Sequence, residues 1–309
     1  MSRKSSSTQS PITNHQSPIT NPQFLIAILV AGGLLTGCEL SSPSRAEDAT
    51  LPKIYNQATT KLAAIQAIQP PAAPPSIVNV GIDQSGSMQT ARVAHAKLAD
   101  VELVLNSLSR TGGTFAMSAI CDRSDRPLIR ETFPEPPRLD VTSIPAPPQR
   151  PETGRGSPFK HQKQLKEYHK EAETYPQKIT VIDQKLDTYK QQLEQYYTNN
   201  QQRINSLKPQ IQTVLNQPRT CQATDIQKAV ERANWLFNEP NTLSQTPRKY
   251  AVFITDGLDT FFTNPAQLKA DQVVLVNGSS NVGVFQSIQH QRFESPNAAF
   301  SALAEWIVR

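Results

Sequence analysis

Residues 77–87 read IVNVGIDQSGS, a short apolar run that passes directly into a polar loop. The first six residues are rich in Val and Ile, which is typical of a strand buried on both faces of a sheet. One carboxylate and two hydroxyls follow, on Asp83, Ser85 and Ser87. Ligands of open α/β sheets bind at the carboxyl ends of the strands, so we expect this loop to lie at the ligand-binding edge.

Strands and helices alternate on both sides of a long interruption, over 76–133 and 218–309. This alternation predicts an α/β fold with a doubly wound, mostly parallel sheet, similar to the Rossmann arrangement and covered by helices on both faces. After the first strand we expect a helix at 91–108, strands at 114–120 and, at an edge, 127–133, a helix at 225–237, strands at 250–255 and 272–276, a weakly marked strand at 290–294 and a helix at 298–308.

The interruption, 134–217, is rich in proline at first and then patterned in heptads. Apolar residues recur at alternating spacings of three and four over 165–196 and, after a phase slip, over 204–214, which predicts a coiled-coil insert. Pro176 and Pro209 are expected to kink or end helices. Because the insert must leave the domain and return, we expect a helical hairpin or a short bundle rather than one rod.

The N-terminal region indicates export. The apolar run 24–35 is shorter than the ~20 residues that a membrane-spanning helix needs, and it ends in the sequence LTGC at 35–38. This ending resembles a bacterial lipobox, which implies that 1–37 is a lipoprotein signal peptide and that lipidated Cys38 anchors the protein to a membrane. An ordinary signal peptide with an incidental cysteine is the alternative. Residues 38–75, rich in Pro, Ser and Ala, predict a stiff tether with room for a short helix at 58–68.

Two later segments carry oxygen ligands suited to the same sheet edge. Residues 250–257 read YAVFITDG, a strand that ends at Asp256, and Thr224 stands just before a predicted helix. Together with the loop at 83–87 they offer only oxygen donors, which suit a hard divalent cation such as Mg²⁺.

The order of these motifs is similar to the metal-ion-dependent adhesion site of von Willebrand factor A (VWA) domains. The motifs are Asp-x-Ser-x-Ser, then Thr-Asp-Ile at a helix start, then Ile-Thr-Asp-Gly at a strand end. The resemblance covers about 76–122 and 220–309, and the insert is foreign to it. It implies that a partner protein supplies an acidic residue to a bound Mg²⁺, Mn²⁺ or Ca²⁺ ion. The implied ligands of this chain are Ser85 and Ser87, which would bind directly, and Asp83, Thr224 and Asp256, which would bind directly or through water.

Two cysteines are expected near this edge. Cys121 follows the second strand and Cys221 lies shortly before Thr224. An exported chain enters an oxidising compartment, which favours a disulfide between them, although two free thiols remain an alternative.

Composition and motifs argue against two classes of function, nucleic-acid binding and catalysis. The net charge of +5 is small and dispersed, which argues against nucleic-acid binding. A phosphotransfer nucleophile at Asp83 typically needs a second acid two residues later, where this chain has Ser85, so we expect no enzyme. The sequence therefore predicts a metal-dependent protein-binding module anchored in the cell envelope, on its periplasmic or surface side. The alternative is an envelope scaffold whose insert binds the partner. The sequence does not indicate an oligomeric state.

Overall fold

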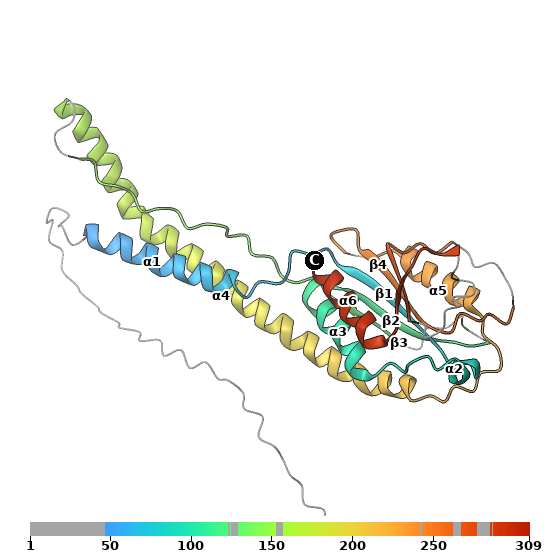
Figure 1. Ribbon diagram of the computed structural model, residues 1–309. Helices are drawn as coiled ribbons and strands as arrows, with labels where there is room; N and C mark the ends of the chain where they lie inside the picture. The colour runs from blue at the N-terminus through green and yellow to red at the C-terminus, as the bar shows by residue number, and fades with distance from the viewer. Residues whose placement is uncertain are drawn as a thin grey trace, which may run out of the picture. The chain divides into compact units, whose positions relative to one another are not determined.

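The computed structural model describes residues 47–122, 124, 129–152, 157–241, 243–261, 267–276, 285 and 287–309, and they form one compact unit. The predicted signal peptide, the lipobox and Cys38 lie outside these residues. Figure 1 shows the elements, which in chain order are α1 (Glu47–Gln66), β1 (Ser76–Asp83), α2 (Ser87–Thr90), α3 (Leu98–Thr111), β2 (Gly113–Ile120), β3 (Ile129–Phe133), α4 (Pro158–Leu215), α5 (Ile226–Asn238), β4 (Arg248–Ile254), β5 (Gln272–Val276), β6 (Gln291–Phe293) and α6 (Pro296–Val308).

The strands form one six-stranded sheet in the order β3-β2-β1-β4-β5-β6. All neighbours are parallel except β3, which pairs antiparallel with β2 at one edge. The prediction of an α/β fold with a mostly parallel sheet is therefore confirmed. The sheet grows outward in both directions from the β1–β4 pair, and the crevice beyond the carboxyl ends of such a pair is where ligands bind in open α/β sheets.

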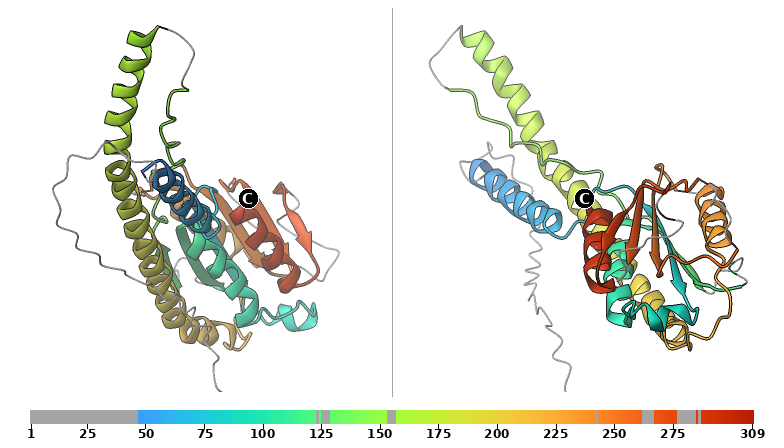
Figure 2. Two further views of the ribbon diagram at one scale, coloured as in Figure 1. Left: turned by 90° about the vertical axis from the view of Figure 1, so that its left-hand side faces the viewer. Right: turned by 45° about the vertical axis from the view of Figure 1, so that its right-hand side comes forward.

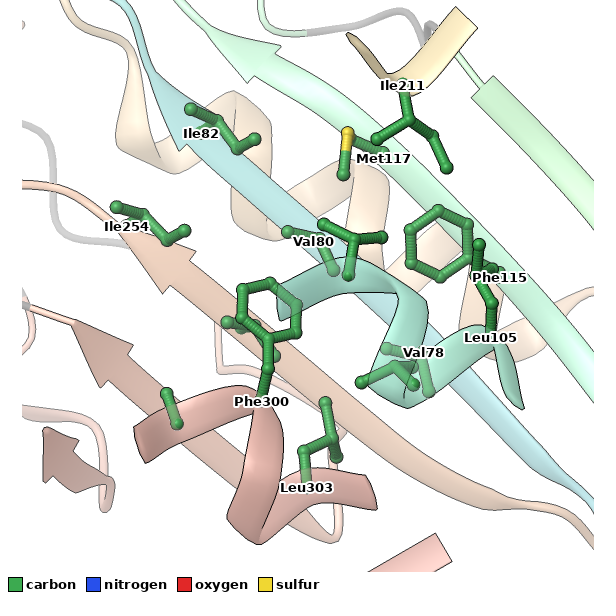
Figure 3. Packing of buried hydrophobic residues seen from close by; sticks show 14 of the residues in the cluster. Val78, Val80, Ile82, Leu105, Phe115, Met117, Ile211, Ile254, Phe300 and Leu303 are labelled. Atoms are coloured by element: carbon green, nitrogen blue, oxygen red, sulfur yellow. The ribbon is translucent and has the colours of Figure 1, made fainter. Parts of the chain in front are cut away.

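Helices cover both faces of the sheet, as the views in Figure 2 show. On one face α3, α6 and the end of α4 enclose a core that includes Val80, Phe115 and Phe300. Figure 3 shows this core from close by, with Ile211 of α4 packed among the strand residues. On the other face α5 packs over a second core that includes Phe253. All eight residues of β1 are buried, which explains why its sequence is almost continuously apolar.

The helix predicted at 91–108 begins later than expected. The sequence predicts a helix from residue 91, whereas α2 ends at Thr90 and α3 begins at Leu98. Arg92 between them has a φ of 53°, a left-handed conformation that interrupts a right-handed helix.

The insert contains one long helix, so the expectation of a hairpin or short bundle was wrong. α4 runs unbroken over 58 residues, with Pro176 and Pro209 inside it. The extended chain before α4 runs out along the helix, and α4 returns to the domain. Val141 and Ile144 of this extended chain are buried in the same cluster as Tyr175 and Leu186 of α4. No second helix of the insert is needed to cover the seam.

The seam of α4 serves two different cores. Its first half packs against α1 and the segment around Val141, and its second half joins the core on the α3 face. Asn200, at the phase slip, is buried between them and its Nδ2 donates a hydrogen bond of 2.9 Å to the Ser109 carbonyl. The slip therefore marks the point where the helix passes from one core to the other.

The predicted tether contains more structure than expected. α1 is a 20-residue helix in which Leu51, Ala58, Leu62 and Ile65 are buried against α4. Their helical spacing forms an apolar stripe, which packing against α4 removes from water. Among the helices in the described part of the chain, none combines the length and apolar character needed to cross a membrane.

Candidate functional site

The loop after β1 is held in a tight turn at the carboxyl edge of the sheet. Asp83 is fully buried, and its Oδ1 accepts a hydrogen bond of 2.8 Å from the Ser85 amide. The hydroxyls of Ser85 and Ser87 lie 2.9 Å apart. This is the short polar turn that Asp and Ser commonly form, and it also places both hydroxyls side by side.

The segment after the insert pairs with this loop like an extra strand. The Cys221 amide donates to the Gln84 carbonyl (3.0 Å), and the Cys221 carbonyl accepts from the Gly86 amide (3.2 Å). Cys221 is also joined to Cys121 by a disulfide, with the two Cα atoms 5.6 Å apart. The backbone and the disulfide together connect the return of the insert to the ends of β1 and β2.

Thr224 is tied to the loop that follows β4. Its amide donates to the Thr260 hydroxyl and its carbonyl accepts from the Thr260 amide, both at 2.9 Å. Thr224 does not cap α5; Asp225 does, since its side chain accepts from the Lys228 amide. The Thr224 side chain is thus not used as a helix cap.

Asp256 lies two residues beyond β4, next to the end of β1. The neighbouring Thr255 hydroxyl donates to Asp83 Oδ2 (2.7 Å) and accepts from the Gly257 amide (3.0 Å). Asp256 is buried, and its Oδ1 accepts from the Leu258 amide. The two predicted ligands Asp83 and Asp256 therefore lie at the ends of adjacent parallel strands.

Burial, hydrogen bonds and a neighbouring negative charge act on the Asp83 carboxyl. Burial raises the pKa of the Asp83 carboxyl above its usual value, hydrogen bonds from Ser85 and Thr255 lower it, and the negative charge of Asp256 raises it again. A pair of buried carboxylates favours any nearby positive charge.

An open depression of about 540 Å³ lies above the acids. Its lining includes the predicted ligands Ser85, Ser87 and Thr224 together with Asp259. Asp83 and Asp256 are buried and do not line it. Three of the five predicted ligands thus share one open surface, and the other two do not reach it.

The predicted ligands offer carboxylate and hydroxyl oxygens, which are the atom types that a hard divalent cation prefers. Asp259 Oδ2 is buried with no hydrogen-bond partner among the described residues, so acidic oxygen capacity remains at this edge. The described residues contain no group of three or more His, Cys, Asp or Glu side chains that could hold a metal ion together. An ion here would therefore depend on hydroxyl oxygens and water as well as on two carboxylates, which Mg²⁺ accepts.

Two further residues of the site carry no sequence signal that would have identified them. Arg219 is buried, with Nη1 donating to the Val93 carbonyl (2.9 Å), and Gln84 Nε2 donates to Gln217 Oε1 (2.7 Å). Both contacts join the end of the insert to the loops of the first half of the domain. They span more than a hundred residues of sequence, so only the folded chain reveals them.

No protein-family model and no curated protein matches this chain. Two solved structures are similar in part. Proximal thread matrix protein 1 from the mussel byssus is 12% identical with a TM-score of 0.34, over 78% of this chain and 49% of that one. The pilus adhesin SpaC from Lactobacillus rhamnosus GG is 11% identical with a TM-score of 0.36, over 78% of this chain and 31% of that one. The chain thus spans about half and about a third of these two proteins, and no conclusion about function rests on either likeness.

Proposed function

We propose that this chain is a VWA-type binding module that holds one divalent cation and, through it, an acidic residue of a partner protein. The observation that carries the proposal is the convergence of three distant segments at the β1–β4 crevice. They are the loop at 83–87, the Cys221–Asp225 segment and the loop at 256–260, and hydrogen bonds link the first to the second and the second to the third.

In this proposal the side chains have distinct roles. The hydroxyls of Ser85, Ser87 and Thr224 would bind the ion at the open surface, and the ion would supply positive charge to an incoming carboxylate. Asp83 and Asp256 would hold the ion from below, directly or through water. Each oxygen of a carboxylate has capacity for a second contact, so the hydrogen bonds that they accept do not prevent this.

The rim of the depression favours a protein as the partner. Leu258 and Phe261 are exposed on the loop that carries Asp259. Large apolar side chains exposed beside a polar site are typical of protein contact surfaces. With Cys38 lipidated, the module would be displayed on the exported side of a membrane in the cell envelope.

The first test is a titration of Mg²⁺ and Mn²⁺ while thermal unfolding is followed. We expect the metal to raise the melting temperature of the wild-type protein and to leave Asp256→Ala unaffected. Asp271→Ala is the matched control, because Asp271 also accepts a backbone amide, that of Lys249, but lies at the start of β5. The absence of any shift for the wild type at millimolar metal would refute the proposal.

A scaffold function of the insert is the second candidate. Phe159 and Val181 are large apolar side chains that α4 leaves exposed, at 80% and 54%. If the partner binds there, Phe159→Ser and Val181→Ser abolish its binding and Ser85→Ala with Ser87→Ala does not. The metal-dependent module predicts the reverse result.

A further inference from the structure

Arg219 is a buried cation that lines a small cavity together with Asp83, one of the two acids of the candidate site. It follows α4 after a short turn and precedes Cys221. Its side chain is only 7% exposed, and Nη1 donates to the carbonyls of Val93 (2.9 Å) and Met88 (3.4 Å). The guanidinium is therefore fixed beneath α2, which begins at Ser87.

Arg219 and Asp83 line the same very small cavity. Arg219, Asp83, Gln84 and His95 line a cavity of about 10 Å³, which has room for about one water molecule. Burial lowers the pKa of the Arg219 guanidinium, and the negative charges of Asp83 and Asp256 raise it. An arginine keeps its charge in a protein, so this positive charge is permanent.

We propose that Arg219 is a built-in counter-ion that neutralises the acid pair when no metal is bound and thereby lowers the affinity of the site for divalent cations. This inference rests on the proposed function, because it names what limits metal binding there. A cation that enters must approach a fixed positive charge in a buried environment, where water screens the repulsion only weakly. The same guanidinium lets the acid loops stay folded without metal.

The end of the insert and Arg219 are hydrogen-bonded to the loops of the site. Gln217 Oε1 accepts a hydrogen bond from Gln84 Nε2, and the Val214 carbonyl at the end of α4 lies 3.5 Å from the same nitrogen. Gln89 Nε2 contacts the Arg219 carbonyl at 3.5 Å. These hydrogen bonds connect the end of the insert to the loop at 83–87, and Arg219 to α2.

Direct Mn²⁺ binding, measured by the paramagnetic resonance signal of free Mn²⁺, tests the inference with two arginine variants. Arg219→Gln should bind Mn²⁺ about tenfold more tightly than the wild type, the size of an ordinary coupling between two sites. Arg248→Gln is the matched control, since Arg248 Nη1 also donates to a backbone carbonyl, that of Trp306, but lies at the opposite end of β4. Its Mn²⁺ affinity should equal that of the wild type.

Each outcome decides between the two proposals. Equal or weaker Mn²⁺ binding by folded Arg219→Gln overturns the inference and leaves the proposed function standing. No binding by either protein at millimolar Mn²⁺ refutes the proposed function, and the inference falls with it. If Arg219→Gln is unfolded in chelator, both proteins are titrated in a stabilising osmolyte that keeps them folded, and equal or weaker Mn²⁺ binding by the variant there also overturns the inference. Arg219→Lys keeps the charge and should bind Mn²⁺ like the wild type.

Discussion

Removal of the disulfide between Cys121 and Cys221 should destabilise the protein strongly. The two cysteines are 100 residues apart, so the disulfide closes a loop that contains the whole insert. In the chain-entropy treatment, closing a loop of this size lowers the conformational entropy of the unfolded chain. This stabilises the folded protein by about 4.7 kcal/mol at 25 °C. Compact denatured chains reduce this value, so we expect Cys121→Ala with Cys221→Ala to lower the free energy of unfolding by about 3–4 kcal/mol.

The assay is equilibrium unfolding in urea with a chelator present. The chain has three cysteines, so a Cys38→Ala background leaves only the pair of interest. The double variant and the reduced parent protein should unfold at the same midpoint, below that of the oxidised parent. The free energy of unfolding should also fall more steeply with urea concentration, because the chain without the disulfide exposes more surface when it unfolds.

Two results would refute this reasoning. If the double variant loses less than about 1 kcal/mol of its free energy of unfolding, the disulfide restricts the unfolded chain very little. A double variant that is much less stable than the reduced parent protein would show that the substitutions themselves, rather than the lost crosslink, cause the effect. The single variants Cys121→Ala and Cys221→Ala should each match the double variant, since either one opens the loop.

Three further predictions concern the site and the insert. Because the pKa of the Asp83 carboxyl is raised in the folded protein, its contribution to metal-free stability is present below the ordinary value of 3.8 and is lost as the pH rises through the raised value. Metal must displace that proton, so Mn²⁺ titrations should show affinity falling as the pH drops toward the raised pKa of Asp83, and an affinity independent of pH would contradict this. Leu186→Ala should destabilise the contact between α1 and α4 by about 2–5 kcal/mol, seen as faster amide exchange in α1 but not in β1, whereas exposed Lys190→Ala should change neither. Asn200→Ala removes the hydrogen bond to the Ser109 carbonyl and should cost about 1–2 kcal/mol in urea unfolding, with exposed Gln201→Ala as the neutral comparison.

Local sequence patterns were sufficient for most of the sheet. The strands at 76–83, 113–120 and 248–254 are short and mostly buried, and each contains a run of mainly apolar residues that the sequence pattern indicated. Their parallel arrangement followed from the helices between them. The placement of Asp83 and Asp256 at one edge followed in turn, because parallel neighbours end on the same side.

The parts that sequence could not predict depend on contacts between distant segments. A heptad pattern predicts an apolar stripe on a helix but not which segment packs against it. Here α1 and the extended chain around Val141 cover half of the apolar stripe of α4. Pro176 and Pro209 suggested breaks, but tertiary packing keeps α4 continuous through both. The position of Arg219 depends on hydrogen bonds to Met88 and Val93 and could not be read from its neighbours in the chain.

The strand order also determines when the sheet can be completed during synthesis. The hydrogen-bonded pair Asp83 and Thr255 is separated by 172 residues, and the insert lies between them. At ~5–20 residues per second, β4 emerges roughly 10–30 s after β1. Until then the nascent sheet is β3-β2-β1, and one edge of its most deeply buried strand has no partner. An unpaired apolar edge pairs readily with other chains, so this interval is when the protein is most prone to aggregate.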